Sequence, residues 1–190
     1  MLPIKKRPFR GAMTVSNKRL RRIEQQVYRN RPEMQSVTVS YEGTLAAGGV
    51  INLKPCSLES SSQRRTGDKI RVYRIEIRGQ VDPDLDGYLI QKKTTADPSS
   101  SMFGTVKGAF ILDSENTNRF TEWRHYRNIN VASPQSPIKL SHSFKGGIQV
   151  KYNGLTTGSC VDNEIIWTFL NRDVDAKGIA CSMRMWYTDA

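Results

Sequence analysis

Lysine and arginine are concentrated at the start of the chain. Ten basic residues lie within positions 1–31, against the single acid Glu24, so this arm carries +9 of the formal charge of +11. The rest of the chain, residues 32–190, carries only +2. A cationic arm on a nearly neutral body is suited to a polyanion, because neutralising phosphates releases condensed counterions. The residues expected to bind nucleic acid are Lys5, Lys6, Arg7, Arg10, Lys18, Arg19, Arg21, Arg22 and Arg29.

A short helix is predicted within this arm, from the N-cap candidate Ser16 to about Asn30. Its apolar residues Leu20, Ile23 and Val27 follow an i, i+3, i+7 spacing and form a narrow seam surrounded by cations. We expect this seam to contact symmetry-related copies of the same helix. The alternative is a solvated helix that forms only partly without a partner.

Two motifs in the body resemble metal or phosphate sites but are incomplete. Asp82-x-Asp84-x-Asp86-Gly87 matches the first half of a calcium-binding EF-hand loop, yet the twelfth position is Lys93, where a bidentate glutamate is needed. We therefore expect a solvent-exposed hairpin turn there. The segment 145–147, Lys-Gly-Gly, predicts a turn before a strand and not a phosphate-binding loop.

The sequence offers few combinations of residues that could form a catalytic site. His125 and His142 are its two histidines, and no nucleophile elbow accompanies either of them. We therefore expect a protein that is not an enzyme and that requires no cofactor.

Cysteine usage and hydropathy indicate where the protein acts. Cys56, Cys160 and Cys181 are odd in number and lack CxxC spacing, so we expect buried thiols in a reducing compartment. We expect no membrane partner, because there is no apolar run of about 18 residues. The N-terminus lacks a secretory h-region, and its prolines and glycine argue against a mitochondrial transit peptide. These features favour the cytoplasm or nucleus.

Beyond Pro32 the sequence reads as short strands separated by turns, with no convincing helix. The clearest strand is Lys69–Val81, in which a phase shift predicts a bulge near Tyr73 and Arg74. The other expected strands are Gln35–Tyr41, Leu45–Leu53, Tyr88–Thr94, Thr105–Leu112, Thr121–Val131, Gly147–Tyr152, Glu164–Leu170 and Gly178–Tyr187. This pattern predicts an all-β sandwich or closed barrel at 32–190, preceded by the arm at 1–31.

The clearest strand also carries a second basic patch, made of Arg71, Arg74 and Arg78. The patch either extends the nucleic-acid contacts of the arm over one sheet face or solvates an exposed strand. The aromatic residues are scattered over the strands, so we expect most of them to serve core and interface packing.

Several segments in order along the chain resemble a known family. They are the segment 64–71, RRTGDKIR, the segment 147–154, GIQVKYNG, and the terminal segment 185–190, MWYTDA. Together they resemble the coat proteins of very small icosahedral viruses: the satellite tobacco necrosis virus family and, in related patterns, the capsid proteins of circular single-stranded DNA viruses.

This resemblance implies a single eight-stranded jelly roll that self-assembles into an icosahedral (T=1) shell of 60 subunits. It implies that the basic arm points inward onto a single-stranded DNA or RNA genome. The localisation implied is the virion.

The resemblance also implies a calcium ion between subunits. By position, Asp189 would supply the carboxylate, and backbone carbonyls near Thr66 and Lys69 of a neighbouring copy would complete the site. A frayed, exposed C-terminus is the alternative.

A cellular single-strand-binding module of the OB type is the competing function. It would need basic and aromatic residues together on one sheet face, and it would form small oligomers at most.

Overall fold

The fold is given by a computed structural model, which describes residues 33–58, 65–106, 109–112, 118–127 and 136–190. The basic arm and its expected helix lie outside the described residues. Contacts divide the chain between Glu33 and Met34, and every described strand belongs to the unit Met34–Ala190.

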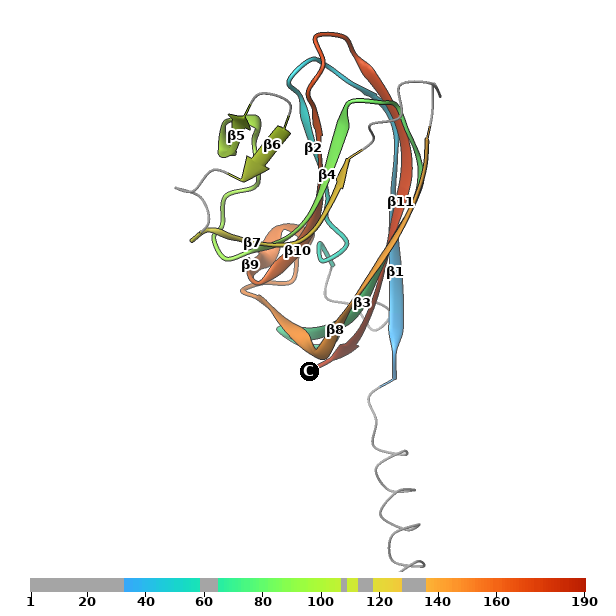
Figure 1. Cartoon of the computed structure of the whole chain (residues 1–190). Coiled ribbons are helices and arrows are strands. Elements are labelled where there is room, and N and C mark those ends of the chain that lie inside the picture. The colour runs from blue at the N-terminus through green and yellow to red at the C-terminus, as the bar shows by residue number, and fades with distance from the viewer. Residues whose placement is uncertain (1–32, 59–64, 107–108, 113–117, 128–135) are drawn as a thin grey trace, which may run out of the picture. The chain divides into compact units, whose positions relative to one another are not determined.

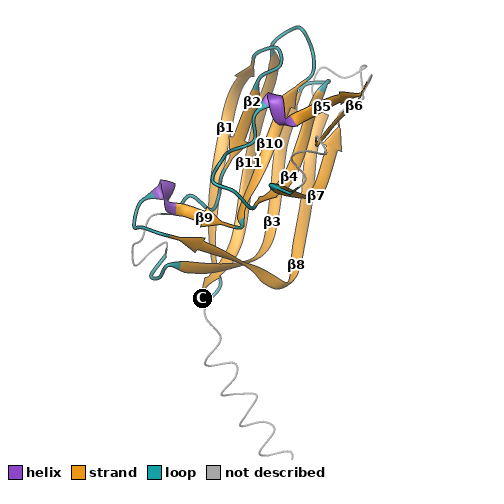
Figure 2. Cartoon of the chain, turned by 90° about the vertical axis from the view of Figure 1, so that its left-hand side faces the viewer, coloured by secondary structure: helices purple, strands orange, loops and turns teal. Residues whose placement is uncertain are grey.

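Two antiparallel sheets face each other in this unit as a β-sandwich (Figures 1 and 2). The first sheet contains, in spatial order, β1 (Gln35–Leu45), β11 (Lys177–Asp189), β3 (Lys69–Val81), β8 (Ser136–Tyr152) and β9 (Cys160–Asp162). The second contains β2 (Val50–Leu53), β10 (Glu164–Asn171), β4 (Leu85–Lys92) and β7 (Phe120–Arg127). A separate hairpin joins β5 (Phe103–Val106) to β6 (Ala109–Leu112), and 3-10 turns occur at Ser100–Met102 and Thr157–Ser159. The expected all-β sandwich is confirmed.

The main core lies between the two sheets and follows the two-residue period of the strands. In β3 the buried Ile75 and Ile77 alternate with outward residues, and in β11 Met183 and Met185 do the same. They pack in one cluster with residues of the second sheet such as Trp167. Alternation of this kind explains how a chain with 37% apolar residues fills a core.

Strand β10 is buried at every position, because the second sheet is covered on both faces. One face meets the main core. The other meets a smaller cluster in which Tyr88, Ile90 and Leu170 pack with Phe103 and Phe120. This double burial accounts for the nearly continuous apolar run in the sequence of β10.

The predicted bulge in β3 is confirmed. Pairing with β8 shifts between Val72 and Arg74, and the opposite neighbour β11 shifts between Trp186 and Tyr187. On β8 the residues 144–147 accommodate the shift, with Gly146 and Gly147 at φ of 79° and 75°. The expected turn at 145–147 is therefore a bulge inside one long strand.

The bounds of some strands match the expectations and those of others do not. Lys69–Val81 has the predicted bounds, whereas β2 retains only the end of the expected Leu45–Leu53. The expected strand Thr105–Leu112 is two strands of a hairpin, β5 and β6. Local alternation locates strands well, but their ends depend on which partner strand continues alongside.

No helix among the described residues is long and apolar enough to cross a membrane.

Candidate functional sites on the sandwich

The residues expected to bind nucleic acid lie in the arm, outside the described residues, as does the seam of Leu20, Ile23 and Val27. The described body contains four places where charged side chains gather.

The first place is the basic patch of β3. Arg74 donates to the Glu76 carboxylate at 2.9 Å, and Arg78 donates to the other oxygen of the same carboxylate. The Arg74 and Arg78 side chains are 48% and 63% exposed. The hydrogen bond from Arg78 and the charges of both arginines outweigh burial and lower the pKa of Glu76. Glu76 thus stays ionised and holds two guanidinium groups over the outer side of the sheet.

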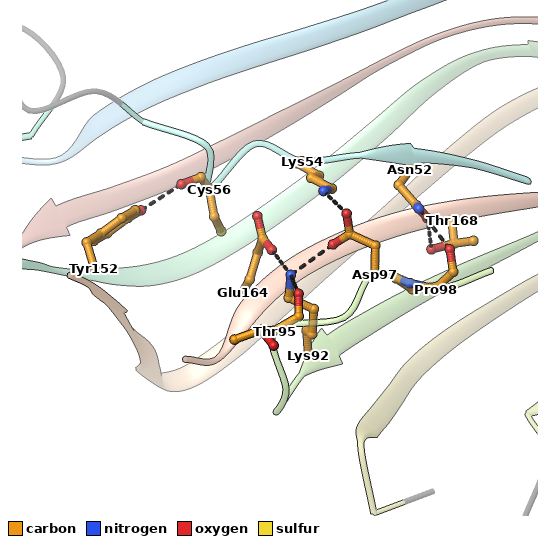
Figure 3. Close-up of polar contacts among 10 residues, drawn as sticks. All are labelled: Asn52, Lys54, Cys56, Lys92, Thr95, Asp97, Pro98, Tyr152, Glu164 and Thr168. Atoms are coloured by element: carbon orange, nitrogen blue, oxygen red, sulfur yellow. Dashed lines mark hydrogen bonds and ion pairs between the residues drawn. The ribbon is translucent and has the colours of Figure 1, made fainter. Parts of the chain in front are cut away.

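The second place is a charged cluster (Figure 3) at a hollow bordered by the end of β4, the start of β10 and β9. The Lys92 ammonium lies 2.6 Å from a Glu164 carboxylate oxygen and 2.8 Å from one of Asp97. Lys54 pairs with the second oxygen of Asp97. The Lys92 and Glu164 side chains are only 5% and 4% exposed, yet they border a hollow of about 320 Å³.

Burial and charge compete within this cluster. Burial opposes the positive charge of Lys92, but hydrogen bonds and attraction from Asp97 and Glu164 outweigh it, so the pKa of Lys92 is raised. Burial likewise opposes the negative charge of Asp97, and its hydrogen bonds with Lys54 and Lys92 nevertheless lower the pKa of Asp97. Lys92 and Asp97 are therefore both charged near neutral pH.

Sequence reasoning did not identify this cluster. Lys92 and Glu164 are directly opposite each other in the pairing of β4 with β10, but they are far apart in the chain. The sequence did contain a signal, since Lys92 ends and Glu164 begins an apolar strand, each in phase with a buried residue, Ile90 or Ile166. Only strand pairing shows that the two charges meet.

The third place overturns the expectation for Asp82–Gly87. Pro83 and Asp84 do form a turn, but the strands that it joins, β3 and β4, belong to different sheets. Asp86 and Gly87 lie inside β4 and are buried, so the segment is not a solvent-exposed hairpin turn. Arg172 contacts Asp86 at 2.9 Å and Asp84 at 3.9 Å, while Asp82 accepts a 2.5 Å hydrogen bond from the Gly178 N–H. Asp84 and Asp86 thus share Arg172, and Asp82 serves a separate structural contact. Nor does any group of three or more metal-binding side chains occur within the described ranges.

The two histidines occupy different surroundings on neighbouring sheets. His125 stacks on Tyr88 at 4.5 Å between ring centroids and lies 3.6 Å from Asp86. His142 accepts a hydrogen bond from Arg124 at 3.3 Å and packs against Trp123 and Phe144. Burial and the charge of Arg124 lower the pKa of His142. Neither arrangement resembles a nucleophile–base pair.

The fourth place joins the C-terminus to the start of β3. Asp189 accepts a hydrogen bond from the Thr66 hydroxyl at 2.6 Å and one from the Thr66 N–H at 3.4 Å. The Lys69 carbonyl accepts from the Ala190 N–H at 3.3 Å. The C-terminus is thus paired and not frayed. The three residues expected at calcium come together within one chain, where Asp189 and the Lys69 carbonyl accept hydrogen bonds.

The three cysteines are free and buried, as expected. Burial raises the pKa of Cys181 to about 12, and burial together with the charge of Glu164 raises that of Cys160 to about 12. Thiols of this kind are unreactive packing groups.

In the comparisons with known proteins, this chain is similar to chains of solved virus structures. No protein-family model matches the chain, and no curated protein does. The similar structures include viral capsid proteins.

The BFDV capsid protein solved as a 60-mer is 8% identical, with 83% of this chain and 93% of that chain covered and a TM-score of 0.39. The decameric form of the BFDV capsid protein is 10% identical, with 83% of this chain and 98% of that chain covered and a TM-score of 0.35. A chain in the structure of the infectious bursal disease virus Gx strain is 8% identical, with 83% of this chain and 32% of that chain covered and a TM-score of 0.26. At these values no residue role is transferred from them to this chain.

Proposed function

We propose that this chain is a viral coat protein that builds an icosahedral (T=1) shell of 60 subunits and packages a single-stranded genome through its basic arm. The observation that carries the proposal is the division of charge: +9 on the first 31 residues and +2 on an all-β body. The role is structural and not enzymatic. The protein would be found in the virion, and before assembly in the cytoplasm or nucleus of the host.

The strand order supports a jelly roll as the shell domain. Eight strands fall into the orders β1-β11-β3-β8 and β2-β10-β4-β7. Each sheet thereby alternates strands from early and late parts of the chain, which is the result of two interleaved Greek keys. In this assignment β9 and the β5–β6 hairpin are additions to the connections between the eight strands.

A two-sheet sandwich suits a shell subunit, because its loops and edges are free to contact neighbours on several sides. Single contacts between small bodies are weak, but a closed shell engages several at once for each subunit. The OB-type alternative fits the described strands poorly, since an OB fold is a five-stranded barrel and here nine strands divide into two sheets.

Two measurements on the purified full chain test the proposal. Multi-angle light scattering and negative-stain imaging should find closed particles of megadalton mass. An arm variant with glutamine at its nine candidate cations should package much less nucleic acid per particle. The control variant Lys93→Gln/Arg124→Gln removes exposed cations of the body and should package the normal amount. A protein that stays a lone subunit with nucleic acid supplied would overturn the proposal.

Calcium between subunits is a separate proposal. Because the groups at Asp189, Thr66 and Lys69 are engaged within one chain, a bound ion would need further oxygen ligands from a second copy. Particles titrated with calcium after chelator treatment should then melt at a higher temperature, and Asp189→Asn particles should not respond. An equal response in both would remove Asp189 from the site.

A further inference from the structure

The side of the first sheet that faces away from the core is strongly polar. Three successive rows cross β1, β11, β3 and β8, and we call their twelve residues the outer face. The rows are Ser36–Trp186–Arg74–Ser143, Thr38–Arg184–Glu76–Ser141 and Ser40–Ser182–Arg78–Lys139. They alternate along each strand with core residues such as Val39, Met183, Ile75 and Leu140.

The outer face concentrates the positive charge of the body. Its four cations and one acid sum to +3, while all of residues 32–190 carry +2, so the rest of the body is slightly negative. Six of the other seven residues carry hydroxyl groups and the last is tryptophan. No aliphatic side chain occurs in the three rows. Such a composition is the opposite of a subunit interface, whose core is depleted in charge.

Interactions within the outer face hold its arginines in place. The Trp186 ring has the guanidinium carbons of Arg74 and Arg184 each 5.0 Å from its centroid. Arg184 also donates to the Ser36 hydroxyl at 2.9 Å, and Glu76 accepts from Arg74 and Arg78. Guanidinium groups fixed in this way lose little entropy when they bind an anion.

A hollow lies among these fixed side chains. It has a volume of about 310 Å³ and is lined by Thr38, Glu76, Arg78, Ser182, Arg184 and Trp186. In the register of the sheet Ser182 lies between Ser40 and Arg78, and Thr38 lies opposite Arg184 in the next row. A second hollow of about 440 Å³ shares Arg78 and Ser182 with it. We call these two adjoining hollows the track; the acidic Glu42 also lines the second one.

We propose that the outer face binds the phosphodiester backbone of single-stranded nucleic acid, as a second contact surface in addition to the arm. The proposal rests on the proposed packaging function and names where on the body the packaged strand lies. Arginine forks and hydroxyl groups are the side chains that proteins use on phosphate oxygens. Glu76 does not repel the strand strongly, since two arginines compensate its charge. The track gives no base-edge readout, so binding is independent of sequence.

The test compares full-length variants for binding to a fluorescein-labelled oligothymidylate at several salt concentrations. Arg74→Gln/Arg184→Gln removes two cations of the outer face and leaves the Glu76–Arg78 pair intact. Lys93→Gln/Arg124→Gln removes the same charge from exposed positions near β4 and β7. For single strands the slope of log affinity against log salt falls by about 0.7 for each phosphate that is no longer neutralised. The outer-face variant should therefore lose roughly 1.4 from the slope, and the control variant should keep the slope of the natural chain.

A chemical footprint supplies the second readout. Lys139 should be protected from acetylation when the oligonucleotide is added to unassembled subunits, while Lys93 should not be. Equal slopes in the two variants, or protection of Lys139 by assembly without nucleic acid, would overturn the proposal; the latter would make the outer face a subunit interface. In either case the arm variant would still lose packaging if the proposed function holds, so the two failures are distinguishable.

Discussion

Lys92 shows how a single buried charge ties the second sheet to the loop that follows β4. Its ammonium group lies between the carboxylates of Glu164 and Asp97, with almost no exposure to water. A buried ion pair contributes little net stability compared with an apolar pair, but removing one member leaves an uncompensated charge. The consequence can be measured with substitutions at the two facing positions.

We expect Lys92→Met to lower the free energy of unfolding by about 3–5 kcal/mol, because Glu164 then stays buried without its cation. The double variant Lys92→Met/Glu164→Leu should recover most of that loss. Urea denaturation followed by tryptophan fluorescence measures both. A double variant as unstable as the single one would mean that the cluster stabilises the fold through more than charge compensation.

The same cluster predicts an acid-sensitive stability. The folded-state pKa of Asp97 lies below its ordinary value of 3.8, so its ionised form stabilises the fold at every pH above that value. This contribution is lost as the pH falls below 3.8 through the folded-state pKa. The difference in melting temperature between the natural chain and Asp97→Asn should be largest near neutral pH and shrink in that acid range. A difference that is constant with pH would exclude ionisation of Asp97 as its cause.

At the scale of elements, the bulge shared by β3 and β8 interrupts the regular pairing of the first sheet. Gly147 has a φ of 75°, and a Cβ atom there would lie 2.5 Å from Arg71 Cγ and 3.1 Å from Tyr73 Cε1. Gly146 has a similar φ of 79° but open space around it. Substitutions at the two glycines therefore distinguish the free-energy cost of a left-handed backbone conformation from the cost of a steric clash.

Gly146→Ala should destabilise the protein by about 1–2 kcal/mol through its backbone conformation alone. Gly147→Ala should cost more, because Arg71 and Tyr73 must also move. Gly158→Ala, which meets no atom within 4 Å, is the matched control and should be nearly neutral. Thermal melts rank the three variants, and equal losses at positions 146 and 147 would show that the clash with Arg71 is relieved easily.

At the scale of the whole molecule, we expect the arm and the body to have different roles. The body buries its apolar residues between two sheets, and both described core clusters are built from residues of the body. The arm has the charge to hold a polyanion. Folding and packaging should therefore be separable.

Deleting Met1–Arg31 should leave a body with the circular dichroism and cooperative melting of a β-sandwich, while nucleic acid packaged per particle falls sharply. The absorbance ratio at 260 and 280 nm of purified particles, followed by nuclease digestion of the extract, measures the loss and identifies DNA or RNA. Equal packaging by the deletion would contradict the role of the arm. Loss of the sandwich itself would show that the arm takes part in folding.

The sequence by itself determined the local properties of this protein. Alternation of apolar residues predicted the strand Lys69–Val81 with its bounds and its bulge, and the odd, isolated cysteines predicted buried thiols. The charge of the arm is likewise visible in the sequence, since it depends only on which residues occur there. Each of these properties depends on neighbours in the chain or on composition.

Only the tertiary structure decided which distant residues meet. Asp86 forms a buried contact with Arg172, Lys92 faces Glu164, and the Arg74 guanidinium lies 5.0 Å from the centre of the Trp186 ring. These contacts arise from the pairing of strands that are far apart in the sequence. The physical reason is that strand alternation specifies which face a residue occupies, whereas the partner across the ladder depends on register and topology, which are set by packing of the whole sandwich.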